Sequence, residues 1–144
     1  MPRLQLKPLA EYGFATEITV RTTDLNYGGH LGNDRLLSLV HEARVAWLGQ
    51  YNWSELDCGG IGLIMGDAAL VYQGEGRAGD RLRFEVAAGE KSRSGFRLFF
   101  RVTRQDEDGP QPIALVENGM VCFDYERRRI APLPAVVAAV CTES

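Results

Sequence analysis

The sequence has 144 residues, with 19 acidic against 16 basic side chains and a formal net charge of -3 at pH 7. A chain of this length buries about two thirds of its unfolded surface in one core, so we expect a single domain over residues 1–144. The small negative charge gives no general attraction to nucleic acid or to an anionic membrane. No apolar run approaches the roughly 20 residues that cross a bilayer, and the N-terminus lacks the apolar stretch of a signal peptide. We therefore expect a cytoplasmic protein.

The cysteines are three in number, widely spaced, and without a Cys-x-x-Cys pair: Cys58, Cys122 and Cys141. An odd count at such spacing argues against both a disulfide framework and a zinc site. We expect reduced cysteines that serve as packing residues, and no metal site.

The predicted elements begin with a strand over residues 15–21, where apolar and polar side chains alternate. A helix is predicted from about residue 33 to residue 50, because apolar residues recur there at helical spacing, at Leu36, Val40, Ala43 and Trp47. Further apolar residues widen this face beyond the stripe of a surface helix. Other parts of the chain must therefore wrap the helix.

Four further strands are predicted after the helix, joined by short turns, over residues 62–73, 82–86, 96–103 and 113–125. The alternation in the middle two is typical of antiparallel strands with one covered face. One early helix followed by these strands predicts an α+β fold, an antiparallel sheet curled around a single long helix. Two prolines end the last strand region, and residues 136–140 are expected to form a short helix.

The loop at residues 22–34, TTDLNYGGHLGND, gathers two acids, two amides, three glycines and an imidazole just before the long helix. Together with HEARVAWL at residues 41–48, it resembles the hot-dog fold thioesterases, the superfamily of 4-hydroxybenzoyl-CoA thioesterase and the acyl-ACP thioesterases. A Gly-Asp turn, RAGD at residues 77–80, is a further and less specific similarity. The resemblance spans about residues 14–130 and leaves a short C-terminal extension. It implies a hot-dog fold, in which the sheet wraps around one central helix.

The resemblance implies hydrolysis of an acyl-CoA or acyl-carrier thioester to a free acid, without a metal or organic cofactor. It places the catalytic carboxylate at Asp24, as general base or as nucleophile. Gly28 and Gly29 would allow close backbone approach, and the amides that open the helix would hold the carbonyl oxygen. His30 would donate to the carbonyl or shuttle a proton, while Asn26 would orient the thioester or a water molecule.

Five other polar positions are candidates on weaker grounds. Glu42 matches the acidic end of the family's Glu-Ala-Arg segment and is a second catalytic candidate, with a solvent-facing position on the helix as the alternative. Asn33 is a candidate for substrate binding, although a helix N-cap is its more ordinary role. Lys91 and Arg93 are candidates for the phosphates of coenzyme A, because basic side chains pair with phosphate. Asp67 is a lone charge in an apolar strand, so we expect it to face either the site or a subunit seam.

Two other functions stay open beside the thioesterase. Hot-dog hydratases of enoyl-CoA pair an aspartate with a histidine in a similar Asp-x-Asn-x-x-His motif, and a binding module would keep the acyl-CoA pocket without turnover. For all three functions, the resemblance implies a homodimer or homotetramer. The sequence itself indicates only that a lone sheet on one helix has edges to protect.

Overall fold

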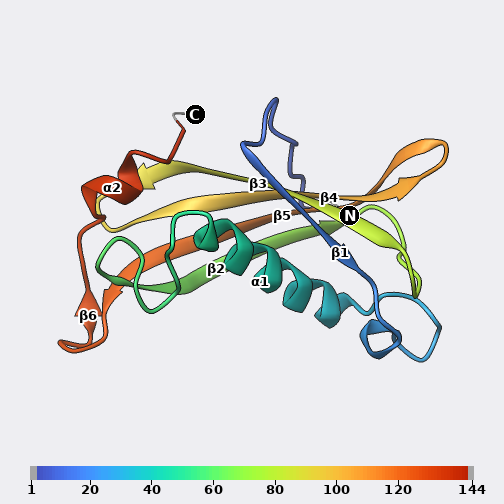
Figure 1. Cartoon of the computed structure of the whole chain (residues 1–144), viewed down its shortest axis with the longest axis horizontal. Coiled ribbons are helices and arrows are strands. Elements are labelled where there is room, and N and C mark those ends of the chain that lie inside the picture. The colour runs from blue at the N-terminus through green and yellow to red at the C-terminus, as the bar shows by residue number, and fades with distance from the viewer. Residues whose placement is uncertain (1–2, 143–144) are drawn as a thin grey trace.

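The computed structural model describes residues 3–142, so the expected domain limits at residues 1 and 144 lie outside the described residues. Its elements in chain order are β1 (Phe14–Thr19), the 3-10 helix η1 (Thr22–Asp24), α1 (Asn33–Gly49), β2 (Gly62–Tyr72), β3 (Arg81–Ser92), β4 (Gly95–Asp106), β5 (Gly109–Asp124), β6 (Arg129–Ile130) and α2 (Ala135–Ala138). All strand pairs are antiparallel, in the order β1-β3-β4-β5-β2, and β6 pairs with β5. The helix α1 lies along one face of this sheet (Figure 1). The expected α+β arrangement is confirmed.

Three strands, β3, β4 and β5, are longer than their side-chain alternation predicts, and β4 runs from Gly95 to Asp106 instead of over residues 96–103. β3 continues to Ser92 because Ala87, Ala88 and Gly89 still pair with β4, although such small residues give no alternating pattern. β5 begins at Gly109 rather than near residue 113. Pairing of the backbone therefore extends beyond the segments that the hydrophobic pattern marks.

The core forms where the apolar face of α1 meets the inner face of the sheet. The helix residues that predicted this face are all buried, and they pack with large buried residues of the central strands such as Phe84, Phe100 and Met120. Within residues 3–142, no helix combines the length and apolar character needed to span a bilayer.

The three cysteines are free and buried, as expected. Burial raises the pKa of the Cys58 thiol to about 12 and that of Cys122 to about 11. Desolvation disfavours the charged thiolate, so these side chains remain protonated packing residues at neutral pH.

The loop before α1 is tied to the end of the sheet where β3 begins. The Val20 N–H donates to the Asp80 carbonyl (2.9 Å), and the Leu31 N–H donates to the Gly76 carbonyl (2.7 Å). β3 has 12 residues and spans roughly 36 Å at about 3.3 Å per residue. The turn between β3 and β4 therefore lies at the opposite end of the sheet from the loop (Figure 1).

A Leu48→Ala substitution tests the helix-to-sheet core. Leu48 is fully buried on α1, and we expect its truncation to lower the free energy of unfolding by about 2–5 kcal/mol, through lost transfer energy and a residual cavity. Urea unfolding measures the effect. The matched control is Leu56→Ala, at a leucine that is 76% exposed; an equal loss in both variants would contradict this description of the core.

Candidate active site

Asp24, the expected catalytic carboxylate, closes the η1 turn and is only 1% exposed. Its Oδ2 accepts hydrogen bonds from the Arg21 N–H (2.8 Å) and Nε (3.2 Å), and its Oδ1 accepts one from Arg21 Nη2 (3.1 Å). The side-chain hydrogen bonds from Arg21 hold the pKa of Asp24 below its ordinary value, against the opposing effect of burial. Within one chain, the Asp24 carboxylate is thus ionised, and both of its oxygens accept hydrogen bonds from Arg21.

Asn26 organises the glycine turn that follows. Its Oδ1 accepts from the N–H groups of Gly28 (2.9 Å) and His30 (3.3 Å), and its carbonyl accepts from the Gly29 N–H (3.1 Å). Gly29 has φ +80°, a conformation that glycine adopts without steric cost. Because the amides of Gly28 and Gly29 are used inside the turn, donors for a substrate oxygen must come from elsewhere.

A cavity of about 250 Å³ opens between this turn, the start of α1 and the segment after β2. Its polar lining comes from Asn26, His30, Asn33, Tyr72 and Glu75. His30 Nε2 lies 3.2 Å from Oε2 of Glu75. The carboxylate fixes the imidazole ring through one nitrogen and leaves Nδ1 as the second functional nitrogen. The structure thus brings together three of the expected site residues, Asn26, His30 and Asn33.

The amino end of α1 contributes to the same cavity. The N-cap is Gly32, without a side-chain cap, and its N–H donates to the Asp24 carbonyl (3.0 Å). The expected N-cap role of Asn33 is therefore wrong. A side chain at position 32 would place its Cβ 2.8 Å from Oδ1 of Asp34, which favours glycine there. Since the first amides of a helix have no partner within it, this end presents partial positive charge beside the cavity.

The remaining candidates lie away from this cavity. Glu42 is exposed on α1, and Lys91 and Arg93 are exposed at the far end of β3. Asp67 points to the outer face of the sheet, where its carboxylate accepts from Arg97 Nη2 (2.9 Å) and Nη1 (3.2 Å). Asp67 therefore does not line the cavity at His30. Its position on the edge strand β2 is compatible with a subunit seam.

Sequence reasoning missed Glu75. It stands in the turn after β2, within GEGRAG, where nothing in the local pattern distinguishes it from a solvated acid. The one available signal was chemical, because a histidine that acts as a base is commonly oriented by a carboxylate.

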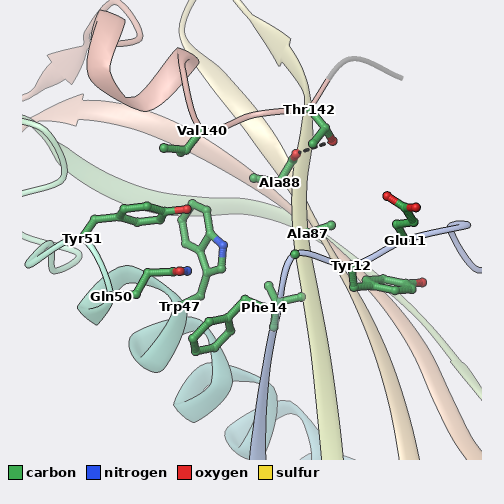
Figure 2. Close-up of a pocket in the computed structure, with 12 residues that line it drawn as sticks. Glu11, Tyr12, Phe14, Trp47, Gln50, Tyr51, Ala87, Ala88, Val140 and Thr142 are labelled. Atoms are coloured by element: carbon green, nitrogen blue, oxygen red, sulfur yellow. Dashed lines mark hydrogen bonds between the residues drawn. The ribbon is translucent and has the colours of Figure 1, made fainter.

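A second hollow, of about 190 Å³, lies at the other end of α1 and has an aromatic wall of Phe14, Trp47 and Tyr51 (Figure 2). Trp47 and Tyr51 pack edge to face, with ring centroids 5.5 Å apart. The carboxyl end of a helix carries partial negative charge, which disfavours an oxygen that becomes negative during a reaction. The electrostatics therefore favour the cavity at the amino end.

Comparison with known proteins identifies the family. Residues 20–140 match the model of the thioesterase-like superfamily. The chain belongs to this superfamily. It is 30% identical over 130 residues to a 1,4-dihydroxy-2-naphthoyl-CoA hydrolase of Synechococcus elongatus, covering 88% of this chain and 91% of that protein. The thioesterase expected from the loop motif is confirmed.

Solved structures support the fold of this thioesterase. A 1,4-dihydroxy-2-naphthoyl-CoA thioesterase from Synechocystis aligns with a TM-score of 0.75 and 24% identity, covering 84% of this chain and 89% of that one. The 4-hydroxybenzoyl-CoA thioesterase from Pseudomonas sp. strain CBS-3 aligns with a TM-score of 0.78 and 17% identity, covering 91% of this chain and 100% of that one. The expected hot-dog fold is confirmed.

The depressed pKa of Asp24 predicts how stability depends on pH. A carboxylate with a lowered native pKa stabilises the fold above its unfolded pKa of about 3.9, and this contribution is lost as the pH falls through the native pKa. We therefore expect the difference in unfolding free energy between the wild type and Asp24→Asn to be constant above about pH 5 and to shrink toward pH 3. Urea unfolding across this range measures it. The difference in unfolding free energy between the wild type and Arg21→Gln should also shrink toward pH 3. A difference that grows as the pH falls would contradict the pairing of Arg21 with Asp24.

Proposed function

We propose that this thioesterase hydrolyses the coenzyme A ester of a hydroxylated aromatic acid, releasing the free acid and coenzyme A. The curated relative is named for 1,4-dihydroxy-2-naphthoyl-CoA, and neighbours in fold include a 4-hydroxybenzoyl-CoA thioesterase and a gentisyl-coenzyme A thioesterase. These acyl groups share an aromatic ring that carries hydroxyl groups. An acyl-carrier thioester is the alternative substrate, and either substrate agrees with the cytoplasmic location expected from the sequence.

The pairing of His30 with Glu75 beside the amino end of α1 is the observation that carries this proposal. His30 Nε2 donates to Glu75, so Nδ1 accepts a proton from water as the water oxygen attacks the thioester carbon. The first amides of α1 stabilise the negative charge on the carbonyl oxygen. When the intermediate collapses, the C–S bond breaks and the thiolate of coenzyme A takes the proton from His30. One water is consumed, and one acid and one thiol are released.

Asp24 is a positioning residue in this proposal. The resemblance assigned it the role of base or nucleophile, but Arg21 engages both of its carboxylate oxygens. Its backbone carbonyl accepts the N–H of Gly32, so the turn that Asp24 closes fixes the start of α1. We infer that Asp24 holds the oxyanion-binding amides in place and that His30 performs the proton transfer.

We further propose a homodimer formed through β2, the edge strand that is paired only with β5. Ile64 and Met65 on β2 are exposed, as is Leu37 on α1, so this edge is apolar as well as unpaired. Antiparallel pairing of β2 with β2 of a second copy would extend the sheet. The two-fold axis reverses strand direction, so this pairing would bring Lys91 and Arg93 of the partner subunit toward the loop end of the first chain, where they would bind the phosphates of coenzyme A.

Substitution of His30 tests the catalytic assignment. We expect His30→Gln to lower kcat by about 100-fold to 10,000-fold on hydroxybenzoyl-CoA thioesters, because proton transfer to the imidazole is lost. Glu75→Gln should give a smaller loss. Release of free thiol measures the rate, and Glu107→Gln, in the exposed turn between β4 and β5, is the control. Full activity in His30→Gln together with complete loss of activity in Asp24→Asn would show that Asp24, and not His30, is the general base.

A charge on the β2 edge tests the dimer. We expect the wild type to have the mass of two chains by light scattering, and Ile64→Lys to shift it toward one chain, because the lysine would be desolvated at the seam. The matched control is Ile130→Lys on β6, where the isoleucine is 62% exposed. A wild type that is monomeric at all concentrations, or an Ile64→Lys protein that keeps the dimer, contradicts the proposal.

A further inference from the structure

A hollow of about 260 Å³ lies between the middle of α1 and the middle of β2. Its walls are mostly apolar, from Leu37, Val40 and Met65, and polar groups enter it from His41, Arg44 and Asn118. The cavity at His30 lies farther along the same two elements, where the Tyr72 hydroxyl at the end of β2 donates to the Asn33 carbonyl at the start of α1. A ligand held at the first cavity therefore has this hollow beside it, along the seam between α1 and β2.

Asn118 has an unused hydrogen-bond donor at this hollow. It lies on β5 with no exposed surface, opposite Ala68 of β2 and Leu98 of β4. Its Oδ1 accepts from Arg44 Nη1 at 2.7 Å. Because a guanidinium can only donate, this contact fixes which end of the amide is oxygen. The remaining atom, Nδ2, is the single buried side-chain nitrogen or oxygen without a hydrogen-bond partner among residues 3–142.

The groups around Asn118 hold its amide in this orientation. Arg44 is 6% exposed, and its Nε donates to Oε1 of Glu55 (3.2 Å). The same Glu55 oxygen lies 2.8 Å from His41 Nε2. The guanidinium is thus neutralised by Glu55 and not free to bind an acidic ligand. Met65, a flexible and half-exposed side chain, lines the same hollow, and its sulfur lies 3.9 Å from Arg44 Nη1. Because Asn118 has no exposed surface, a ligand would reach its amide only if side chains that line the hollow, such as Met65, moved aside.

A buried donor without a partner costs free energy unless something pairs with it. The structure provides a mostly apolar hollow lined in part by Asn118, whose buried N–H group has no partner. A flat apolar group that carries one acceptor oxygen matches both features. An acidic group fits less well, because the nearby positive charge is already paired.

We propose that Asn118 is a specificity-determining residue, whose Nδ2 donates to a ring oxygen on the aromatic acyl group of the substrate. This inference rests on the proposed function, because it places the acyl group along the seam between α1 and β2. The ring packs against the apolar walls, and its hydroxyl oxygen accepts from Asn118. A substrate without that oxygen leaves the amide unpaired and is discriminated against for this reason.

The decisive variant is Asn118→Asp. Aspartate keeps an acceptor for Arg44 and has the same shape, but it replaces the donor with an oxygen. The panel is 2-, 3- and 4-hydroxybenzoyl-CoA and 1,4-dihydroxy-2-naphthoyl-CoA, each compared with benzoyl-CoA. We expect the wild type to have a higher kcat/KM for at least one of these hydroxylated thioesters than for benzoyl-CoA. In Asn118→Asp, the ratio of these two kcat/KM values should fall by about tenfold or more. Asn52→Asp, in the exposed turn after α1, should retain the wild-type ratio. Thermal unfolding of each variant checks that it is folded.

Binding of the free acids provides a second readout that does not need turnover. The hydroxylated acid of the preferred thioester should bind the wild type more tightly than its parent acid without the hydroxyl, by calorimetry, and Asn118→Asp should lose that difference. If no coenzyme A ester is hydrolysed, the proposed function fails, and the free acid of each thioester in the panel is titrated instead. Tighter binding of a hydroxylated acid than of its parent acid, lost in Asn118→Asp, would then still support the donor site. If esters are hydrolysed but no hydroxyl preference exists, or it survives in Asn118→Asp, the specificity role is overturned and the proposed function stands.

Discussion

Burial of one apolar helix against the inner face of one sheet is the constraint on which the other features depend. Leu36, Val40, Ala43 and Trp47 are all buried in that interface, so a helix that slid or rotated would expose apolar surface to water. Its amino end is thereby fixed beside the loop of residues 22–32, which backbone hydrogen bonds tie to the start of β3. The positive end of the helix and the imidazole of His30 thus lie at the same cavity because α1 packs against the sheet along its whole length.

The sequence was sufficient for the helix and for the order of the strands, because both follow from the periodicity of apolar residues. It also identified the loop that forms one wall of the cavity. It could not provide the partners of the polar groups. His30 pairs with Glu75, and Arg44 with Asn118, across 45 and 74 positions of the chain; such contacts arise only when the sheet is assembled. The engagement of Asp24 by Arg21 is local, yet a short loop leaves several pairings equally open.

The strand β2 presents two surfaces that its sequence does not distinguish. Its inner face supplies Met65 and Ala68 to the hollow at Asn118, while its free edge and Asp67 lie toward the outside of the sheet. A small residue at position 68 beside the buried amide leaves space that a larger side chain would fill. In the proposed complex, the strand serves both recognition of the acyl group and contact with a second subunit.

The burial of the three cysteines has a consequence for an enzyme that releases coenzyme A. Exchange between a thiol and a disulfide requires an accessible thiolate, and the raised pKa values of Cys58, Cys122 and Cys141 keep these sulfurs in the neutral form. Oxidised forms of the released cofactor therefore meet no reactive sulfur on the protein among its described residues. The enzyme is thus protected from forming a mixed disulfide with oxidised coenzyme A.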